Sequence, residues 1–216
     1  MIKIEHTEVY GWEAAIRGMR NPMNSWNKSD SWWDFVEDPS IINPNDEVKF
    51  VVGENDHDLM VRLAKGGGVH AKYRRMITVT CDITAPLYWW KEFDTYKVGT
   101  VANSCSTMHK IHAKEFTLDD FSHEHLFGWA MKDLEYDIKR LNFFCRNYIK
   151  TKDKTWWWQM IQRLPSSYNQ KRTVQLNYEV LVGMYRDRRN HKLDEWRTLC
   201  DWIRELPYSE IITVGE

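Results

Sequence analysis

Hydrophobic positions in the first half of the chain switch between helical and strand periods. Residues 1–20 predict a strand followed by a short helix, and residues 54–65 predict a second helix that three consecutive glycines end. Alternation over residues 77–83 has the period of a half-buried strand. Residues 87–96 predict the helix that follows, because Pro86 suits the first turn of a helix.

Helical periods dominate the second half of the chain. Thr117, with Asp120 three residues later, is a modest helix-start signal. Four later segments show apolar residues at helical spacing: 134–145, 155–163, 172–188 and 193–206. The pattern therefore predicts a chain that is richer in helix toward its C-terminal half.

Two stretches lack a clear period and predict loops. Residues 21–50, rich in Asn, Pro, Ser, Asp and Trp, predict a long loop anchored by tryptophan, and residues 97–116 predict an ordered loop. A loop as long as the first is often functional inside a domain. Without an internal repeat or a low-complexity linker, residues 1–216 predict a single domain of the mixed α/β (α+β) class.

Composition changes this picture in two ways. The formal net charge of -1 argues against nucleic-acid binding through bulk charge, although a local basic patch stays open. The 12 tryptophans are unusual, and clusters stand at 32–33, 89–90 and 156–158. They are consistent with core and subunit-interface packing, or with stacking on planar ligands such as bases or a flavin ring.

The cysteines and the N-terminus bear on the cellular compartment. The four cysteines are too widely spaced for a zinc pattern, so free thiols in a reducing compartment are expected. The first residues lack an apolar signal core, and no stretch approaches a membrane-spanning run. These features predict a cytoplasmic protein with no membrane partner.

Several residues could carry chemistry but match no complete motif. The glycines 66–68 follow a helix rather than a strand, which favours a helix cap over a phosphate loop. The pairs His109/His112 and His123/His125 lack an obvious third ligand, so no metal site is expected. Cys105, in a loop of hydroxyls and amides, is either an inert thiol or a nucleophile.

Basic residues gather near the C-terminal half of the chain. If residues 172–188 were one helix, Arg172 and Arg186 would stand about four turns apart and present cations at both ends of one face. A solvated helix face is the common outcome of such a pattern. A phosphate pocket is the alternative, because the arginine fork matches phosphate oxygens.

Three segments, in order, carry a family resemblance. The first is a helix end, a histidine and a strand that runs into Ala-Pro: residues 63–67, His70 and 76–87. The second is 91–97, followed by 98–107. The third is Leu164-Pro165, Lys171-Arg172, Asn177-Tyr178-Glu179, Arg188 and 195–197, and residues 16–20 add a weaker match. Together they resemble the flavin-dependent thymidylate synthases.

The resemblance implies a fold and a set of ligands. It implies a central, mostly antiparallel sheet flanked by helices, in a homotetramer whose sites lie between subunits. The family reaction transfers one carbon from methylenetetrahydrofolate to C5 of deoxyuridine monophosphate (dUMP), with FAD carrying reducing equivalents from NADPH. The protein would mainly orient these ligands and supply electrostatics.

The resemblance also assigns residues. It places the cofactor at His70, Thr95, Tyr96, Lys97 and Asn177. It places the nucleotide at Glu92, Asn103, Lys171, Arg172 and Arg188. Cys105 stands at the position of the motif serine, which makes it the candidate catalytic residue.

The departures from the family pattern fall on the chemistry. Thr95, Tyr96 and Lys97 replace Arg-His-Arg, and Glu179 and Thr107 each replace an arginine. Two hypotheses therefore stay open. One is a divergent flavin-dependent enzyme that modifies pyrimidine C5, and the other is a non-catalytic protein that binds or sequesters a nucleotide on the same fold.

Overall fold

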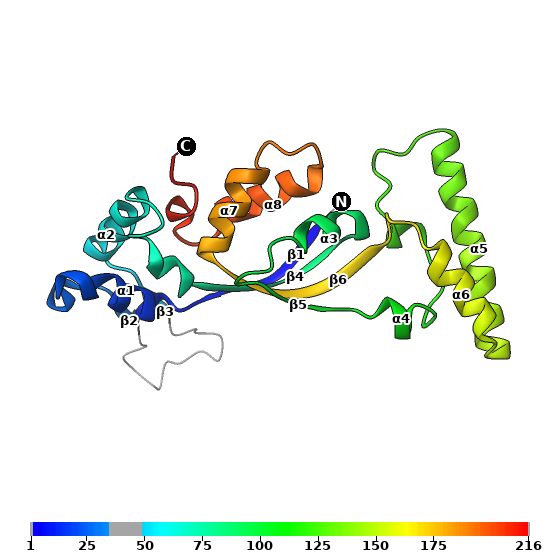
Figure 1. Cartoon of the computed structure of the whole chain (residues 1–216), viewed down its shortest axis with the longest axis horizontal. Coiled ribbons are helices and arrows are strands. Elements are labelled where there is room, and N and C mark those ends of the chain that lie inside the picture. Colours follow the sequence, from blue (N-terminus) through cyan, green and yellow to red (C-terminus); the bar gives the residue numbers. More distant parts are fainter. Residues whose placement is uncertain (1, 35–48, 216) are drawn as a thin grey trace, which may run out of the picture.

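A four-stranded antiparallel sheet forms the middle of the protein (Figure 1). The structure is a computed structural model, and it describes residues 2–34 and 49–215. In spatial order the strands are β1 (Lys3–Tyr10), β4 (Thr78–Pro86), β6 (Asn169–Asn177) and β5 (Val101–Ser104). The central pair, β4 and β6, is in register over nine residues, from Thr78 opposite Asn177 to Pro86 opposite Asn169.

Buried apolar residues and partly exposed polar residues alternate along the central strands, which gives the sheet two different faces. On β4, Val79, Cys81 and Ile83 are buried, whereas the residues between them are polar and partly exposed. The apolar face is covered by α3 (Leu87–Phe93), α7 (Tyr178–Arg188) and α8 (Asp194–Glu205) (Figure 1). We call the opposite side, which carries the threonines of β4 and the odd-numbered residues of β6, the polar face.

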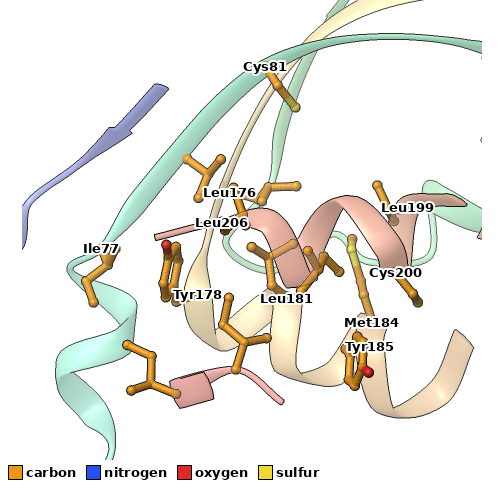
Figure 2. Close-up of a cluster of buried hydrophobic side chains, with 14 of the residues drawn as sticks. Ile77, Cys81, Leu176, Tyr178, Leu181, Met184, Tyr185, Leu199, Cys200 and Leu206 are labelled. Carbon is orange, nitrogen blue, oxygen red and sulfur yellow. The ribbon is translucent and has the colours of Figure 1, made fainter. Parts of the chain in front are cut away.

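The main core lies between the apolar face and these helices. Figure 2 shows Cys81 and Leu176 of the sheet in one buried cluster with Leu181 of α7 and Leu199 of α8. Beside them, a group of fully buried aromatic side chains packs in close ring contacts: Trp89, Trp90, Phe93 and Trp196. Burying these large side chains excludes water along the whole apolar face, which fixes the three helices on the sheet.

A helical arm projects from the other end of the sheet. It consists of α5 (Trp129–Thr151) and α6 (Lys154–Arg163), which pack side by side (Figure 1). A second cluster of buried residues, separate from the main core, joins the arm to residues 111–121; it includes Phe121, Leu141 and Met160. The arm therefore has its own small hydrophobic core.

Two helices and a short ribbon form the end opposite the arm. They are α1 (Trp12–Arg20), α2 (Glu54–Lys65), β2 (Trp32–Asp34) and β3 (Lys49–Val51). The remaining elements are α4 (Thr107–Lys110) and 3-10 turns at Asn21–Met23, Trp26–Lys28, Lys72–Arg75, Leu118–Asp120 and Ser209–Ile211. Within the described ranges, no helix combines the length and the apolar character needed to cross a membrane.

The structure confirms the predicted class, a mixed fold with a mostly antiparallel sheet flanked by helices. The helix over 54–65 has the predicted bounds and ends at Gly66, and the helix predicted over 193–206 is α8. The helix predicted over 87–96 ends earlier, at Phe93. Thr117 and Asp120 form the predicted capping box, but on a single 3-10 turn.

Three other predictions were wrong. Residues 97–116 contain β5 and α4 rather than only loop, and their short strand offered too few residues for a period to show. The described part of 21–50 carries two 3-10 turns, β2 and the start of β3; residues 35–48 lie outside the described ranges. Residues 172–177 belong to β6, so Arg172 and Arg186 do not share a helix.

Candidate functional site

Lys171 lies at the centre of a polar group on the polar face, which we call the Lys171 group. Its ammonium nitrogen is 2.9 Å from Asp82 Oδ2. Thr173 Oγ1 donates to Asp82 Oδ1 at 2.6 Å, and His6 Nδ1 lies 3.1 Å from Asp82 Oδ2. The Asp82 carboxylate of β4 thus contacts one residue of β1 and two residues of β6.

Hydrogen bonding fixes the charges of this group. The hydrogen bonds from Thr173, Lys171 and His6 hold the pKa of Asp82 well below its ordinary value. The same contact with Asp82 raises the pKa of Lys171. Both side chains are therefore charged at neutral pH, and Lys171 keeps an exposed fraction of 41% for a further anionic partner.

Asn103 and Cys105 border the same group from the edge strand. Asn103 is directly opposite Thr173 in the register of β5 and β6. Cys105 continues that register, because its backbone N–H donates to the carbonyl of Lys171 at 2.9 Å. Directly opposed residues of antiparallel strands project to one face. The Cys105 thiol is free and exposed, so three of the sequence-predicted residues meet here.

Glu92, Tyr96 and Arg188 form a second group on the covered side of the sheet. Arg188 Nη1 donates to Glu92 Oε2 at 2.8 Å, and Arg188 Nε donates to the Tyr96 hydroxyl at 2.9 Å. Trp196 Nε1 donates to the same Glu92 oxygen at 2.8 Å, and His191 Nε2 is 3.5 Å from it. Arg188 is already neutralised by a carboxylate in this arrangement.

Arg172 points away from Lys171, because adjacent strand residues face opposite sides of a sheet. Arg172 Nη1 donates to Asp94 Oδ1 at 2.7 Å, and its Nε donates to Gln170 Oε1 at 3.0 Å. The guanidinium lies 4.1 Å from the centre of the Trp90 ring. These contacts lie under α3, and Gln170 Nε2 also donates to the carbonyl of Cys105 at 2.8 Å.

A cavity of about 400 Å³ lies beside the turn after α3 and is lined by Tyr96, Lys97 and Thr100, among others. The Thr100 hydroxyl is buried and has no hydrogen-bond partner among the described atoms. Thr95 Oγ1 donates to the Glu92 carbonyl at 2.7 Å, which closes the end of α3. Lys97 is exposed.

Asn177 has a structural task at the junction of β6 and α7. Its side-chain oxygen accepts from the backbone N–H of Val180 at 3.0 Å and caps α7. Gly99 packs closely against it: a Cβ at Gly99 would stand 3.0 Å from Asn177 Nδ2, at a φ of +76°. The Asn177 cap thus packs against the turn at Gly99, which follows the sequence-predicted cofactor residues at positions 95–97.

His70 lies apart from the Lys171 group, on the exposed turn that follows α2. Glu179, which stands where the sequence resemblance predicts an arginine, is 2.9 Å from Arg74 Nε, and Arg74 Nη1 donates to the Ile211 carbonyl at 2.9 Å. Arg74 is 3% exposed. The carboxylate therefore neutralises a buried guanidinium and ties the turn after α2 to the start of α7.

The structure thus divides the predicted site between two sides of the sheet. Lys171, Asn103 and Cys105 meet on the polar face, whereas Glu92, Tyr96, Arg172 and Arg188 lie on the covered side. The sequence reasoning missed Asp82, Thr173 and His6. A signal existed for Asp82, because it is the one carboxylate among the threonines on the half-exposed positions of β4.

The remaining candidates from the sequence are the histidine pairs and the tryptophan clusters. No group of three potential metal ligands occurs among residues 2–34 and 49–215. Trp89 and Trp90 belong to the core, whereas Trp26, Trp32 and Trp33 are 51%, 52% and 43% exposed. In the structure, therefore, packing accounts for only some of the tryptophan clusters.

Comparison with known proteins supports the fold. No protein-family profile matches the sequence, and a search of the curated proteins finds no match. Thymidylate synthase X of Helicobacter pylori, solved with FAD and dUMP, is similar in structure at a TM-score of 0.69 and 13% identity, over 100% of this chain and 98% of that chain. A second structure of the Helicobacter pylori flavin-dependent enzyme with FAD and dUMP gives 0.66 and 13%, over 95% and 94%.

A methylase has the same architecture. The UMP/dUMP methylase PolB of Streptomyces cacaoi, bound with 5-bromo-dUMP, is similar at a TM-score of 0.58 and 11% identity, over 100% of this chain and 95% of that chain. At such identities the likeness shows the fold. The chain therefore has the fold of the flavin-dependent thymidylate synthases.

Proposed function

We propose that the protein modifies C5 of dUMP, as a divergent relative of the flavin-dependent thymidylate synthases with a folate one-carbon donor. The observation that carries this proposal is the Lys171 group, where a cation, an amide and a free thiol meet on the polar face. The fold adds support, because its solved neighbours hold dUMP or a brominated analogue.

Three side chains of the Lys171 group have chemistry that suits a pyrimidine nucleotide. Lys171 supplies a cation for the phosphate or for a ring carbonyl, and it would exchange part of its contact with Asp82 for the ligand. The Asn103 amide both donates and accepts, which suits the imide edge of uracil. The Cys105 thiol borders the same position and is the group we assign to attack on the ring.

The cavity beside the turn after α3 suits a phosphate-bearing cofactor. Lys97 supplies a cation there, and the buried Thr100 hydroxyl lacks a partner that a bound ligand would provide. Tyr96 supplies an aromatic wall. A flavin bound there would carry reducing equivalents from a nicotinamide donor, and the chain's own residues would bind and orient it.

A second candidate function is nucleotide binding without turnover. The loss of cations expected at the cofactor site favours it: Thr95, Tyr96 and Lys97 stand where the resemblance predicts Arg-His-Arg, and Glu179 stands where it predicts an arginine and is 2.9 Å from Arg74 Nε. In this case the Lys171 group would bind the nucleotide, and the protein would bind no flavin cofactor.

We further propose a homotetramer in the cytoplasm. Large side chains stay exposed on the helical arm and the segment before it, where Phe127, Trp129 and Tyr136 are 85%, 80% and 59% exposed. Surfaces of this kind mark interfaces between subunits. All four cysteines are free, which suits a reducing compartment. Light scattering after gel filtration measures the assembly.

The first experiment is the visible absorption spectrum of the purified protein after FAD is added and the sample is desalted. A retained flavin band near one per chain supports the enzyme, and its absence leaves only the binding protein. Calorimetry with dUMP then compares wild type with Lys171→Gln and with Lys139→Gln, an exposed lysine on α5. Loss of dUMP binding in Lys171→Gln alone is expected; equal binding in all three would refute the site.

A further inference from the structure

The charge of the chain is distributed unevenly along the sequence. The whole chain has 30 basic and 31 acidic residues, and residues 137–163 of the helical arm hold seven of the basic residues and two of the acidic ones. This segment therefore carries a formal net charge of +5, whereas the rest of the chain carries -6. A polyanion would be repelled by most of the protein and attracted to the arm.

Ion pairs neutralise the arginines of this segment but not its lysines. Arg146 Nη1 is 2.9 Å from Glu115 Oε1. Asp137 Oδ1 is 3.1 Å from Arg163 Nη2 and 3.9 Å from Arg140 Nη1. The four lysines of the segment form no ion pair with any residue that the structure describes. The lysines are therefore the cations that stay available to a partner.

Three of these lysines gather at the turn between α5 and α6, which forms the free end of the arm (Figure 1). Lys150 is in the last turn of α5, Lys152 follows that helix and Lys154 begins α6, and all three are exposed. We call them the arm-tip lysines. Asp153 is the one acid between them, and its Oδ1 accepts from the backbone N–H of Thr155 at 2.9 Å, which caps α6. Three cations thus stand beside one carboxylate that already binds a helix end.

The three consecutive tryptophans of α6 have different environments. Trp157 Nε1 donates to the Met108 carbonyl at 3.1 Å and anchors α6 to α4. The Trp156 ring meets the Phe143 ring of α5 edge to face, with 5.6 Å between the ring centres. Trp158 stays 43% exposed. Contacts between elements thus account for two of the three indoles, and the third is displayed at the surface.

Two contacts orient the exposed indole of Trp158. The Trp157 ring meets it at 71°, with 4.7 Å between the ring centres, and Lys154 Nζ is 5.7 Å from the centre of the Trp158 ring. Lys154 and Trp158 are four residues apart and therefore lie on one face of α6. An oriented ring beside a cluster of cations is the combination that single-stranded nucleic-acid sites use, because the ring stacks on a base while the cations hold neighbouring phosphates.

The sequence of the turn favours a nucleic acid over a membrane surface. Residues 151–154, at the very end of the arm, read Thr-Lys-Asp-Lys and include no apolar side chain. An element that binds a membrane buries an apolar face among the lipid chains. Here the polar turn leads, and the exposed indole stands one helical turn behind it.

We propose that the free end of the helical arm binds single-stranded nucleic acid, with phosphates on the arm-tip lysines and a base on Trp158. The proposal goes beyond the function proposed above, because the site shares no residue with the Lys171 group or with the cavity beside the turn after α3. It also differs from the surface that we assign to subunit contacts, which lies before α5 and in its first turns.

The test is the fluorescence anisotropy of a fluorescein-labelled oligothymidylate of about 20 nucleotides, titrated with the full-length protein at several salt concentrations. Saturable binding that weakens as salt rises is expected. The triple variant Lys150→Gln/Lys152→Gln/Lys154→Gln should bind at least about 10-fold more weakly. The slope of log K against log salt concentration should also become shallower by about 2, since each phosphate contact on a single strand contributes about 0.7.

Substitutions of Trp158 test the stacking contact. Trp158→Ala should weaken binding of the oligothymidylate at least about 5-fold, which is within the range of a lost base–aromatic stack, and should leave the salt slope unchanged. Trp158→Phe keeps an aromatic ring and should keep most of the affinity. Equal binding by wild type and Trp158→Ala would overturn the assignment of the base to this ring.

A matched control removes the same charge from the opposite end of the molecule. The variant Lys28→Gln/Lys65→Gln/Lys72→Gln changes three exposed lysines there and should bind the oligothymidylate as wild type does, as should Lys171→Gln. The proposal is overturned if wild type shows no saturable binding, or if the control triple variant weakens binding as much as the arm-tip variant. Cosedimentation with phosphatidylserine vesicles that depends on Trp158, without oligothymidylate binding, would overturn it in favour of a membrane.

Discussion

A single carboxylate oxygen of Glu92 connects three elements of the covered side. It accepts from Arg188 at the end of α7 and from the indole of Trp196 on α8, while Glu92 itself belongs to α3. The charge of the carboxylate makes these hydrogen bonds stronger than neutral ones. Glu92 therefore has a structural role, because it links α3 to α7 and α8. This role is sufficient to explain why an acid stands at this position.

The coupling of Glu92 and Arg188 is measurable by a double-mutant cycle with Glu92→Gln and Arg188→Gln. Each single change should destabilise the fold by about 1–3 kcal/mol, because it leaves a half-buried charged or polar group without its partner. The double variant should be less destabilised than the sum of the two. Denaturant unfolding measures all four proteins, and strict additivity would contradict the contact.

Asp56 gives a prediction for acid stability. Burial alone would raise its pKa, but the hydrogen bonds from Ser29, Ser31 and Arg20 outweigh burial and hold the pKa below its ordinary value. A carboxyl whose pKa is lower in the folded state stabilises that state above the unfolded pKa, and the contribution is lost as the pH falls through the folded pKa.

Asp56→Asn should therefore destabilise the protein by about 3–5 kcal/mol at pH 7, because Arg20 would stay buried without its counter-charge. The difference from wild type should begin to narrow below about pH 4, where the unfolded chain starts to protonate this carboxyl. It should vanish once the pH falls through the lowered pKa of Asp56 in the folded protein. Urea unfolding across this pH range is the measurement. Asp58→Asn, an exposed acid on the same helix, should change stability by less than about 0.5 kcal/mol at either pH.

At the scale of elements, the junction between β1 and α1 depends on one glycine. Gly11 has a φ of +93°, and a Cβ there would overlap the carbonyl oxygen of Met76. Gly67 has a similar φ of +89°, but nothing lies within 4 Å of its added Cβ. The two positions thus share a left-handed backbone conformation, which strains any residue other than glycine, and they differ in the space around the added Cβ.

Gly67→Ala should cost about 1–2 kcal/mol, which is the strain of a left-handed alanine. Gly11→Ala should cost about 1–3 kcal/mol more, because the overlap with Met76 forces a shift of β4 relative to α1. Thermal unfolding of the two variants side by side tests this. Equal losses would mean that the junction relaxes freely.

The elements that the sequence predicted well are those in which the hydrophobic period extends over several turns and reflects packing against one neighbouring element. Helix α2 has three turns, an apolar stripe and a glycine stop, and its bounds were predicted correctly. Strand β6 was predicted as helix, because Val174 and Tyr178 share the helical stripe of α7 although the chain changes from strand to helix at Asn177. That change depends on pairing with β4, which is information from a distant part of the chain.

The candidate site shows the same division. The family-like order of residues pointed to Lys171, Asn103 and Cys105, and their meeting on one face required the register of β5 on β6. Asp82 could not be assigned a partner from sequence, because its two partners on β6 lie about ninety residues away. The closed contact between Glu92 and Arg188 was likewise out of reach of a linear pattern.

At the scale of the whole molecule, two cores are joined by the sheet. The main core lies under α7 and α8, and the core of the helical arm packs around Leu141 and Phe121. The link between them includes the bridge of Phe121 to Tyr168, just before β6. Separate cores with few shared contacts open independently in a folded protein.

Leu141→Ala should therefore loosen the arm selectively. The side chain is 1% exposed, so its truncation removes about 2–5 kcal/mol of packing from the arm core. Amide hydrogen exchange should rise across α5 and α6, while β4 and β6 keep the protection of wild type. Lys139→Ala, on the exposed side of α5, serves as the control; equal acceleration in the sheet would show that the two cores unfold together.

The alternation of β6 has a consequence for how the gene can change. Lys171 and Arg172 are neighbours in sequence and serve opposite sides of the sheet. Deleting or inserting one codon within the strand would shift its register by one residue on one side of the change, and every side chain there would move to the opposite face of the sheet. Arg172 would then be exposed to solvent, and Lys171 would lie beneath α3. A substitution along β6 thus changes one side chain at a time. An insertion or deletion between Asn169 and Asn177 would move the side chains of the polar face to the covered side, and those of the covered side to the polar face.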